Sequence, residues 1–236
     1  MIELIRSVMR FPLILLAVVA LLPSCASYIT PGGPADLGQI TADGRRASPA
    51  AKYPARIAVI QVQQSGYKSQ TTTGVGTGAF SVVTKPDAGG DQDLRRLSGL
   101  PKVADAIRPT ANQLPVRLDS AADLRTALKG MEVDHLLLYT LDTRFSSSDI
   151  LRPLSVVSFG FSPTQKFQVT SSASAVLLDA RSGHVYGSVE EITVDSGYSS
   201  GWGKRGAMDE QRLKTERESL NKLLESFDSL WRRMNR

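Results

Sequence analysis

The chain has 236 residues, with 28 basic and 23 acidic side chains and a formal net charge of +5 at pH 7. This basic excess is small and spread along the chain, whereas nucleic-acid binding usually requires clustered basic and aromatic side chains, so we expect no nucleic-acid partner. The single cysteine excludes a disulfide within the chain, and the length is sufficient for one domain with its own core.

The amino terminus has the three parts of an export signal. Residues Met1–Arg10 carry the bases Arg6 and Arg10 against one acid, and Phe11–Leu22 is an unbroken apolar run. The run is shorter than the roughly 20 residues that a membrane-spanning helix needs, and it fits the apolar core of a signal peptide. We therefore predict a signal peptide over residues 1–24.

The signal ends at Leu22-Pro23-Ser24-Cys25, which resembles the lipobox of bacterial lipoproteins. The resemblance implies that the Cys25 sulfur carries diacylglycerol and that the new amino group is acylated, for example with palmitate. Two acyl chains anchor a protein stably, because each buried methylene contributes about 0.8 kcal/mol. Pro23 is less usual at its position than Ala or Ser, and the alternative is an incidental thiol near a cleavage site.

The resemblance to a lipobox also predicts the membrane to which the protein is anchored. Ala26, rather than Asp, follows the cysteine, which in enterobacteria-like hosts favours the outer membrane. We therefore expect a lipid-anchored protein of the cell envelope, on the outer membrane and facing the periplasm.

A tether is predicted between the anchor and the domain, over residues 25–52. The stretch Ala26–Pro54 is rich in Ala, Pro, Gly and Ser and lacks the apolar period of a strand or a helix. About 30 flexible residues span roughly 30 Å root-mean-square, so the domain, residues 53–236, would stay beside its membrane.

The first half of the domain alternates strands and helices. Arg56–Gln63 is β-branched and apolar and predicts a strand, and the loop Ser65–Gly78 separates it from a short strand over Ala79–Thr84. Leucines spaced three apart in Asp91–Leu100 predict a short helix, and Val103–Ile107 is a further strand candidate. Next, Asp119-Ser120 caps a helix whose apolar stripe consists of Ala121, Leu124, Leu128 and Met131.

The second half contains the most apolar strand and a hairpin. The continuous run Leu136-Leu137-Leu138 in Val133–Leu141 indicates a strand that is covered on both faces. We expect a polar loop at Ser146–Asp149. Phe167–Asp179 alternates, with Phe167, Val169, Ala173, Ala175 and Leu177 on one face. A turn at Ala180–Gly183 then leads into the partner strand His184–Val194.

The chain ends with a long helix predicted over about Met208–Met234. Its apolar face consists of Leu213, Leu220, Leu223, Leu224, Phe227, Leu230, Trp231 and Met234. The charged residues predicted to lie off that face are Glu216, Glu218, Lys222, Glu225 and Asp228. Acids flank the apolar face where a membrane-surface helix would have lysines, so we expect the helix to pack on the sheet. The predicted fold is a single α/β (α+β) domain with a mixed, largely antiparallel sheet of five to seven strands.

No catalytic, cofactor or metal motif stands out. Gly74–Gly78 contains glycines in the manner of a phosphate loop, but it neither follows a strand directly nor opens a helix. His135 and His184 are the only histidines, and two distant ligands do not define a zinc site. The adjacent acids Glu190 and Glu191 should point to opposite faces of a strand. We expect neither an enzyme, a cofactor nor a bound metal.

One apolar segment is a candidate for partner binding. Leu154–Phe161 lies between two prolines, and alternation places Val157, Phe159 and Phe161 on one face. If this face is exposed, it forms a lip on which a partner docks. The alternative is an ordinary strand of the sheet.

Three stretches resemble a group of uncharacterised bacterial lipoproteins: Leu136–Phe145, Pro153–Phe161 and Ser174–Gly187. More loosely, the chain is similar to periplasmic α/β lipoprotein domains, such as those of penicillin-binding-protein activators, the curli secretion lipoprotein and the amino-terminal domain of the Tol propeller protein. That resemblance implies a protein-binding assembly or regulatory factor without catalytic residues. The alternative is a small-ligand-binding or enzymatic periplasmic lipoprotein.

Overall fold

The computed structural model describes residues 32–44, 49–149, 165–199 and 204–235. The sequence-predicted lipidation site Cys25 and the segment Leu154–Phe161 lie outside these residues. None of the helices in the described ranges combines the length and the apolar character needed to cross a membrane.

A six-stranded mixed sheet forms the centre of the domain. Along one edge, β1 (Ala55–Gln64) pairs antiparallel with β3 (Phe80–Val83) and parallel with β4 (Val103–Ile107). Along its other edge, β1 pairs parallel with β6 (His135–Asp149). The sheet then continues antiparallel through β7 (Gln165–Asp179) to β8 (Val185–Ser199), which confirms the predicted fold class.

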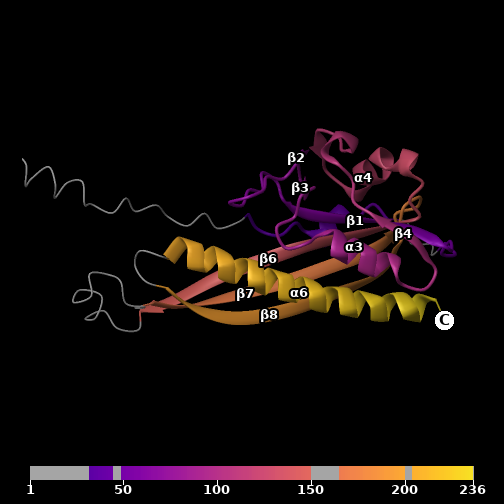
Figure 1. Ribbon diagram of the computed structural model, residues 1–236. Coiled ribbons are helices and arrows are strands. Elements are labelled where there is room, and N and C mark those ends of the chain that lie inside the picture. The colour runs from indigo at the N-terminus through magenta and orange to yellow at the C-terminus, as the bar shows by residue number, and fades with distance from the viewer. Residues whose placement is uncertain (1–31, 45–48, 150–164, 200–203, 236) are drawn as a thin grey trace, which may run out of the picture.

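Helices cover both faces of this sheet. The long carboxy-terminal helix α6 (Lys204–Met234) and the short helix α3 (Asp91–Ser98) lie on one face. Figure 1 shows α6 running along the length of β6, β7 and β8. On the other face lie α4 (Ala121–Ala127) and α2 (Leu37–Ile40). The smaller elements are β2 (Thr77–Gly78), which pairs with β5 (Arg117–Leu118), and the 3-10 turns η1 (Ala111–Gln113) and η2 (Lys129–Met131).

The sheet separates two apolar cores. Leu137 belongs to the core beneath α3 and α6, whereas Leu136 and Leu138 belong to the core beneath α4. All three leucines are at most 2% exposed. The prediction of a strand covered on both faces is therefore confirmed, because successive side chains of a strand point to opposite faces.

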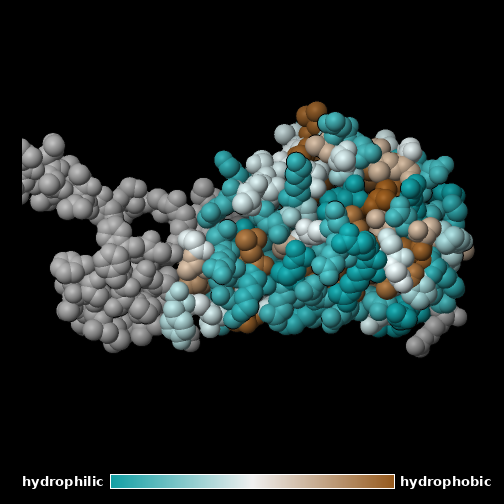
Figure 2. Space-filling model, viewed as in Figure 1, coloured by the Kyte–Doolittle hydropathy of each residue, from teal (hydrophilic) through white to brown (hydrophobic). Residues whose placement is uncertain are grey.

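The helix α6 packs on the sheet through the predicted face, with Leu220, Leu223, Phe227 and Trp231 buried. Its outward surface is largely hydrophilic in Figure 2. The placement of Glu216 off the buried face was wrong: Glu216 is 3% exposed. Glu216 precedes Leu220 by four residues and Leu223 by seven, so helical geometry places it on the buried side of α6. Its charge is accommodated there by Arg212 and Thr143.

The β6–β7 hairpin is longer than the sequence predicts. Ser146–Asp149 was expected to be a loop, but these residues belong to β6, and Ser146 pairs with Gln168. Backbone hydrogen bonds extend a ladder into polar sequence where a face is solvated, so apolar alternation does not reveal its end.

Residues 32–44 differ from the predicted tether because they contact the domain. Gln64 donates from its backbone to the Gly33 carbonyl at 3.0 Å, and the Ala35 backbone donates to Thr140 Oγ1 at 3.0 Å. Ile40 is 2% exposed within the core beneath α4. Single, irregularly spaced residues make these contacts, so the sequence of the segment shows no apolar period.

His135 lies at the start of β6 in an aromatic cluster with Tyr53, Tyr186 and Trp231. Its ring centroid is 5.3 Å from that of Tyr186 and 5.6 Å from that of Trp231. The side chain is fully buried, and neither ring nitrogen has a hydrogen-bond partner among the residues that the structure describes. Burial lowers the pKa of His135, against the opposing effect of the Asp179 carboxylate.

Acidification is therefore expected to destabilise the protein through His135. The imidazole is neutral in the folded state, and it takes up a proton on unfolding once the pH is below its ordinary pKa of 6.5. The stability that it contributes is present above that pH and is lost as the pH falls toward the lowered folded pKa. Denaturant unfolding from about pH 7.5 to about pH 5.5 should show a smaller loss in His135→Phe than in the wild type. A His184→Gln control keeps His135 and should retain the wild-type slope; equal slopes in all three proteins would contradict the prediction.

Candidate functional site

The outer face of β8 carries a row of exposed apolar side chains. From Gly187 onward, after the bulge in the pairing with β7, odd-numbered residues of this strand face α6: Ser226 donates to Glu191, and Lys214 is paired with Asp195 at 2.7 Å. The even-numbered residues of that part face outward, and three of them are large and apolar. We call Ile192, Val194 and Tyr198, which are 59%, 52% and 61% exposed, the β8 strip.

The free edge of β8 lies beside this strip. β8 is 15 residues long and pairs only with β7 among the described strands, so one row of its backbone groups has no strand partner. Its charged side chains are Glu190, Glu191 and Asp195, with no lysine or arginine. Charges on an edge strand discourage pairing with an identical strand, and here all of them are negative.

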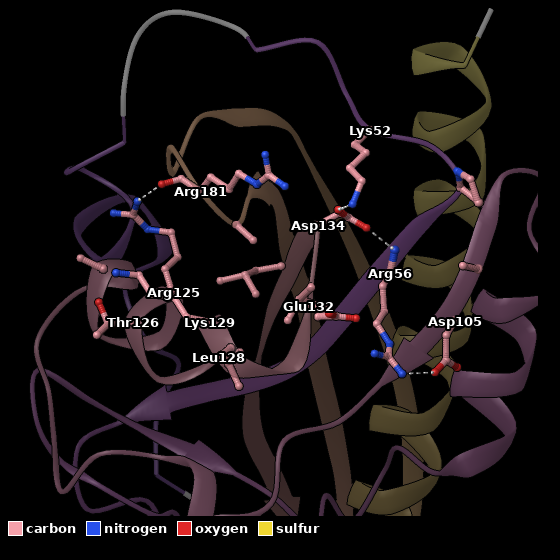
Figure 3. A pocket seen from close by; sticks show the side chains of 16 residues that line it. Lys52, Arg56, Asp105, Arg125, Thr126, Leu128, Lys129, Glu132, Asp134 and Arg181 are labelled. Carbon is pink, nitrogen blue, oxygen red and sulfur yellow. Dashed lines mark hydrogen bonds and ion pairs between the residues drawn. The ribbon is translucent and has the colours of Figure 1, made fainter.

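A cleft of about 940 Å³ opens where the amino-terminal ends of β1, β4 and β6 meet α4 and the β7–β8 turn (Figure 3). Its volume is in the range of small-molecule sites. The floor is apolar, with Leu128 and Leu136 almost fully buried. The rim is charged, and its side chains come from segments that are far apart in the sequence.

Three basic side chains at the rim are held by acids. Lys52 Nζ lies 2.9 Å from Asp134 Oδ1, and Arg56 Nη2 lies 3.5 Å from Asp105 Oδ2. Arg125 Nη2 lies 2.6 Å from Oδ2 of Asp43, and its Nη1 donates to the Arg181 carbonyl at 3.2 Å. These pairs connect residues 43–56 and the β7–β8 turn to α4 and the sheet.

The cleft also has charged residues that no such pair holds. Within the described ranges, Lys129, Glu132 and the guanidinium of Arg181 have no ion-pair or hydrogen-bond partner. Figure 3 shows the Arg181 side chain extending over the cleft from the turn, on the side between Arg125 and Lys52.

The residues considered in the sequence do not come together into one site. Cys25, Val157, Phe159 and Phe161 lie outside the described residues. His135 is a core residue, and in the described part of the chain no group of three or more His, Cys, Asp or Glu is placed to hold a metal. Glu190 accepts from Ser172 on the outer face of the sheet, whereas Glu191 faces α6.

The glycine-rich stretch is also not placed like a phosphate loop. Thr77–Gly78 form β2 against β5, and Val75 bridges to Val82 of β3. Gly76 has a φ of +93° with the Leu118 side chain 2.5 Å from where its Cβ would lie, so a larger residue is excluded there. These glycines therefore serve local packing between loops.

Sequence reasoning missed both the β8 strip and the cleft. Apolar residues at Ile192 and Val194 were visible in the predicted partner strand, but nothing local showed that their face lacks a cover. The basic residues of the cleft are dispersed between residues 52 and 181, so no sequence motif indicates that they form a site.

The comparisons with known proteins give only a remote likeness. No protein-family model matches the chain. No curated protein matches it either. Among solved structures it is similar to lipoprotein GNA1162 of Neisseria meningitidis, at 14% identity and a TM-score of 0.32 over 68% of this chain and 96% of that one.

Two further structures are similar to the same degree. One is the PelC dodecamer of Paraburkholderia phytofirmans, with 14% identity and a TM-score of 0.30 over 76% of this chain and 96% of that one. The other is protein XCC0632 of Xanthomonas campestris, with 14% identity and a TM-score of 0.34 over 84% and 97% of the two chains. The similarity is distant and at the level of the fold, and it does not extend to a role.

Proposed function

We propose that the chain is a lipid-anchored envelope protein that acts by binding another protein, as an assembly or regulatory factor, and not by catalysis. The observation that carries this proposal is the combination of an apolar strip and a free strand edge on β8. Large exposed apolar side chains in a row favour an interaction site over chance exposure. A free edge accepts an extended segment of a partner as an additional strand.

Charge defines the chemistry of that segment. Self-pairing of β8 would bring its acids close to those of a second copy with no base on either strand to neutralise them, which is unfavourable. A segment with alternating apolar side chains would cover Ile192 and Val194, and basic side chains beside them would match Glu190. The proposed partner is therefore an apolar and basic extended segment of a different protein.

The anchor at Cys25 would hold this surface near a membrane. Gly32 already lies against Tyr67, with the Tyr67 Cα 3.3 Å from where a Cβ of Gly32 would stand. Gly32 is seven positions after Cys25, and a fully extended chain over seven positions spans at most about 25 Å. The effective tether is thus much shorter than the one predicted from sequence, and the partner would be met close to the lipid surface.

Site-specific crosslinking in cells tests the proposal. A photo-reactive amino acid at exposed Ser196 should crosslink to one partner segment of the stated composition, identified by mass spectrometry. The double variant Ile192→Lys/Val194→Lys should remove the crosslink, because it places positive charge on the surface that meets a basic segment. Val116→Lys is the matched control, since Val116 is 81% exposed elsewhere on the surface, and it should leave the crosslink unchanged.

Two results would contradict parts of the proposal separately. Crosslinks that persist equally in the β8 double variant would show that β8 is not the docking surface. In the same cells, Cys25→Ser should abolish palmitate labelling and release the chain from the membrane fraction. Labelling equal to wild type would mean that Cys25 is not the anchor, whatever the outcome for β8.

A further inference from the structure

The basic side chains around the cleft outnumber the acidic ones. Lys52, Arg56 and Arg125 are neutralised by Asp134, Asp105 and Asp43. The rim has two further bases, Lys129 and Arg181, and one further acid, Glu132. None of these three side chains has a partner in the described ranges, so one positive charge at the mouth of the cleft is unmatched.

The paired residues hold the cleft open and fixed in shape. Arg125 connects α4 to both residue 43 and the β7–β8 turn, and its side chain is only 14% exposed. Arg56 donates from its backbone to Asp134 at 3.0 Å and from Nη1 to the Met131 carbonyl at 3.1 Å. The turn that carries Arg181 is itself ordered, because Asp179 Oδ1 accepts from the Ser182 backbone at 2.6 Å. Arg181 and Lys129 are thus presented from fixed backbones.

The floor of the cleft differs in chemistry from its rim. It is formed by small and aliphatic side chains from α4, the start of β6 and the turn. These are Ala122, Leu128, Val133, Leu136 and Ala180. A cleft with apolar walls and a few polar groups at one side matches a ligand that has an apolar body and one polar end.

We propose that this cleft binds a small organic oxyanion, in which a carboxylate or a phosphate ester is attached to an apolar body. The oxyanion binds the Arg181 guanidinium, which extends over the cleft (Figure 3), and the apolar body lies on the floor. Arginine suits this role because its planar guanidinium donates two parallel hydrogen bonds to a carboxylate or a phosphate. Glu132 opposes binding and limits its affinity. The cleft lies at the opposite end of β1 from Gly32, so this site is separate from the end at which the chain enters the domain.

Calorimetry on the full-length chain purified in detergent tests the inference. Benzoate and phenyl phosphate serve as probes, and benzyl alcohol is the neutral control of the same size. Both anions should bind and benzyl alcohol should not, and the tighter of the two anions identifies the preferred oxyanion. Arg181→Ala should raise the Kd about fivefold to tenfold, as expected for the loss of a charge-assisted hydrogen bond at a partly exposed site. Lys129→Ala removes a positive charge from the same cleft but not that hydrogen bond, and it should raise the Kd by a smaller factor.

Glu132→Gln gives the sharpest readout, because a merely structural role would not improve binding. Removing its charge should lower the Kd for the preferred anion. Arg144→Ala is the matched control, since Arg144 is an exposed arginine on the hairpin, away from the cleft, and it should have no effect. The proposal is overturned if neither anion binds, if benzyl alcohol binds as tightly as benzoate, or if the cleft variants retain the wild-type Kd.

Discussion

Replacing Arg212 with methionine is expected to reduce the free energy of unfolding by about 3–5 kcal/mol, the usual cost of removing one partner from a buried ion pair. The Arg212 side chain is fully buried on α6. Its Nη2 lies 3.2 Å from Asp87, and its Nη1 lies 2.9 Å from Glu216. Both carboxylates are less than 10% exposed, so the variant leaves them in the interior without the opposing charge.

Further hydrogen bonds hold the two carboxylates that pair with Arg212 in the interior of the protein. Ser69 donates to Asp87 at 2.7 Å from the loop after β1, and Thr143 of β6 donates to Glu216 at 2.8 Å. Arg212 thus joins α6, the sheet and the loop in one place. Denaturant unfolding of the purified chain measures the effect, because the midpoint reports stability at a constant slope.

Arg232→Met is the matched control on the same helix. Arg232 is paired with Asp228 one turn away, but its side chain is 56% exposed, and exposed pairs contribute about 0–1 kcal/mol. Equal effects of the two substitutions would contradict the assignment of Arg212 as a buried structural charge.

The loss at Arg212 should also depend on pH. Burial raises the pKa of Glu216, and Arg212 opposes that shift. Without Arg212, the pKa of Glu216 rises further, so the folded variant binds a proton that the unfolded chain releases above its ordinary pKa. The variant should therefore lose less stability at about pH 5 than at about pH 8. A loss that is the same at both values would show that Glu216 is not the group left uncompensated.

The second large effect is expected for Phe227→Ala, which should cost about 3–5 kcal/mol. Phe227 is fully buried on the side of α6 that packs on the sheet, and its ring centroid lies 6.1 Å from that of Trp231. Truncation removes apolar contacts and leaves a cavity that the rigid sheet cannot fill. Leu223→Ala, at 2% exposure, should cost about 2–5 kcal/mol for the same reason.

Ser229→Ala is the control, because Ser229 lies on the exposed side of α6 two residues from Phe227. Its effect should stay within about 0.5 kcal/mol. Unfolding midpoints that match the wild type in both core variants would mean that this face of α6 is not in the core.

Features that repeat along the chain could be predicted from sequence. The apolar period of 3.6 located α6, and alternation located β7 and its buried face. The run Leu136-Leu137-Leu138 indicated a strand with two covered faces. These predictions were confirmed because burial on one side of a regular element imposes a period on the residues of that element.

The candidate sites could not be predicted in the same way. The three residues of the β8 strip alternate like any half-buried strand, and they are exposed because the core beneath α4 does not extend to them. The bases of the cleft come from the chain before β1, from β1 itself, from α4 and η2, and from the β7–β8 turn, so they meet only after the sheet has formed. Charge alone does not distinguish Lys129 or Arg181 from other surface bases.

The sequence by itself determined the order and type of the main elements and predicted the export signal that ends at Cys25, because periodicity and composition are local properties. Only the tertiary structure decided which polar residues are buried. Arg212 and Glu216 lie on the same side of α6 as Leu220 and Leu223, and their charges can be buried there because Asp87 and Thr143 from distant segments bind them. The same holds for residues 32–44, which are fixed by contacts to Gln63 and Thr140 that no local pattern encodes. Contacts between segments far apart in the chain leave no period in either segment, so their outcome depends on the folded arrangement alone.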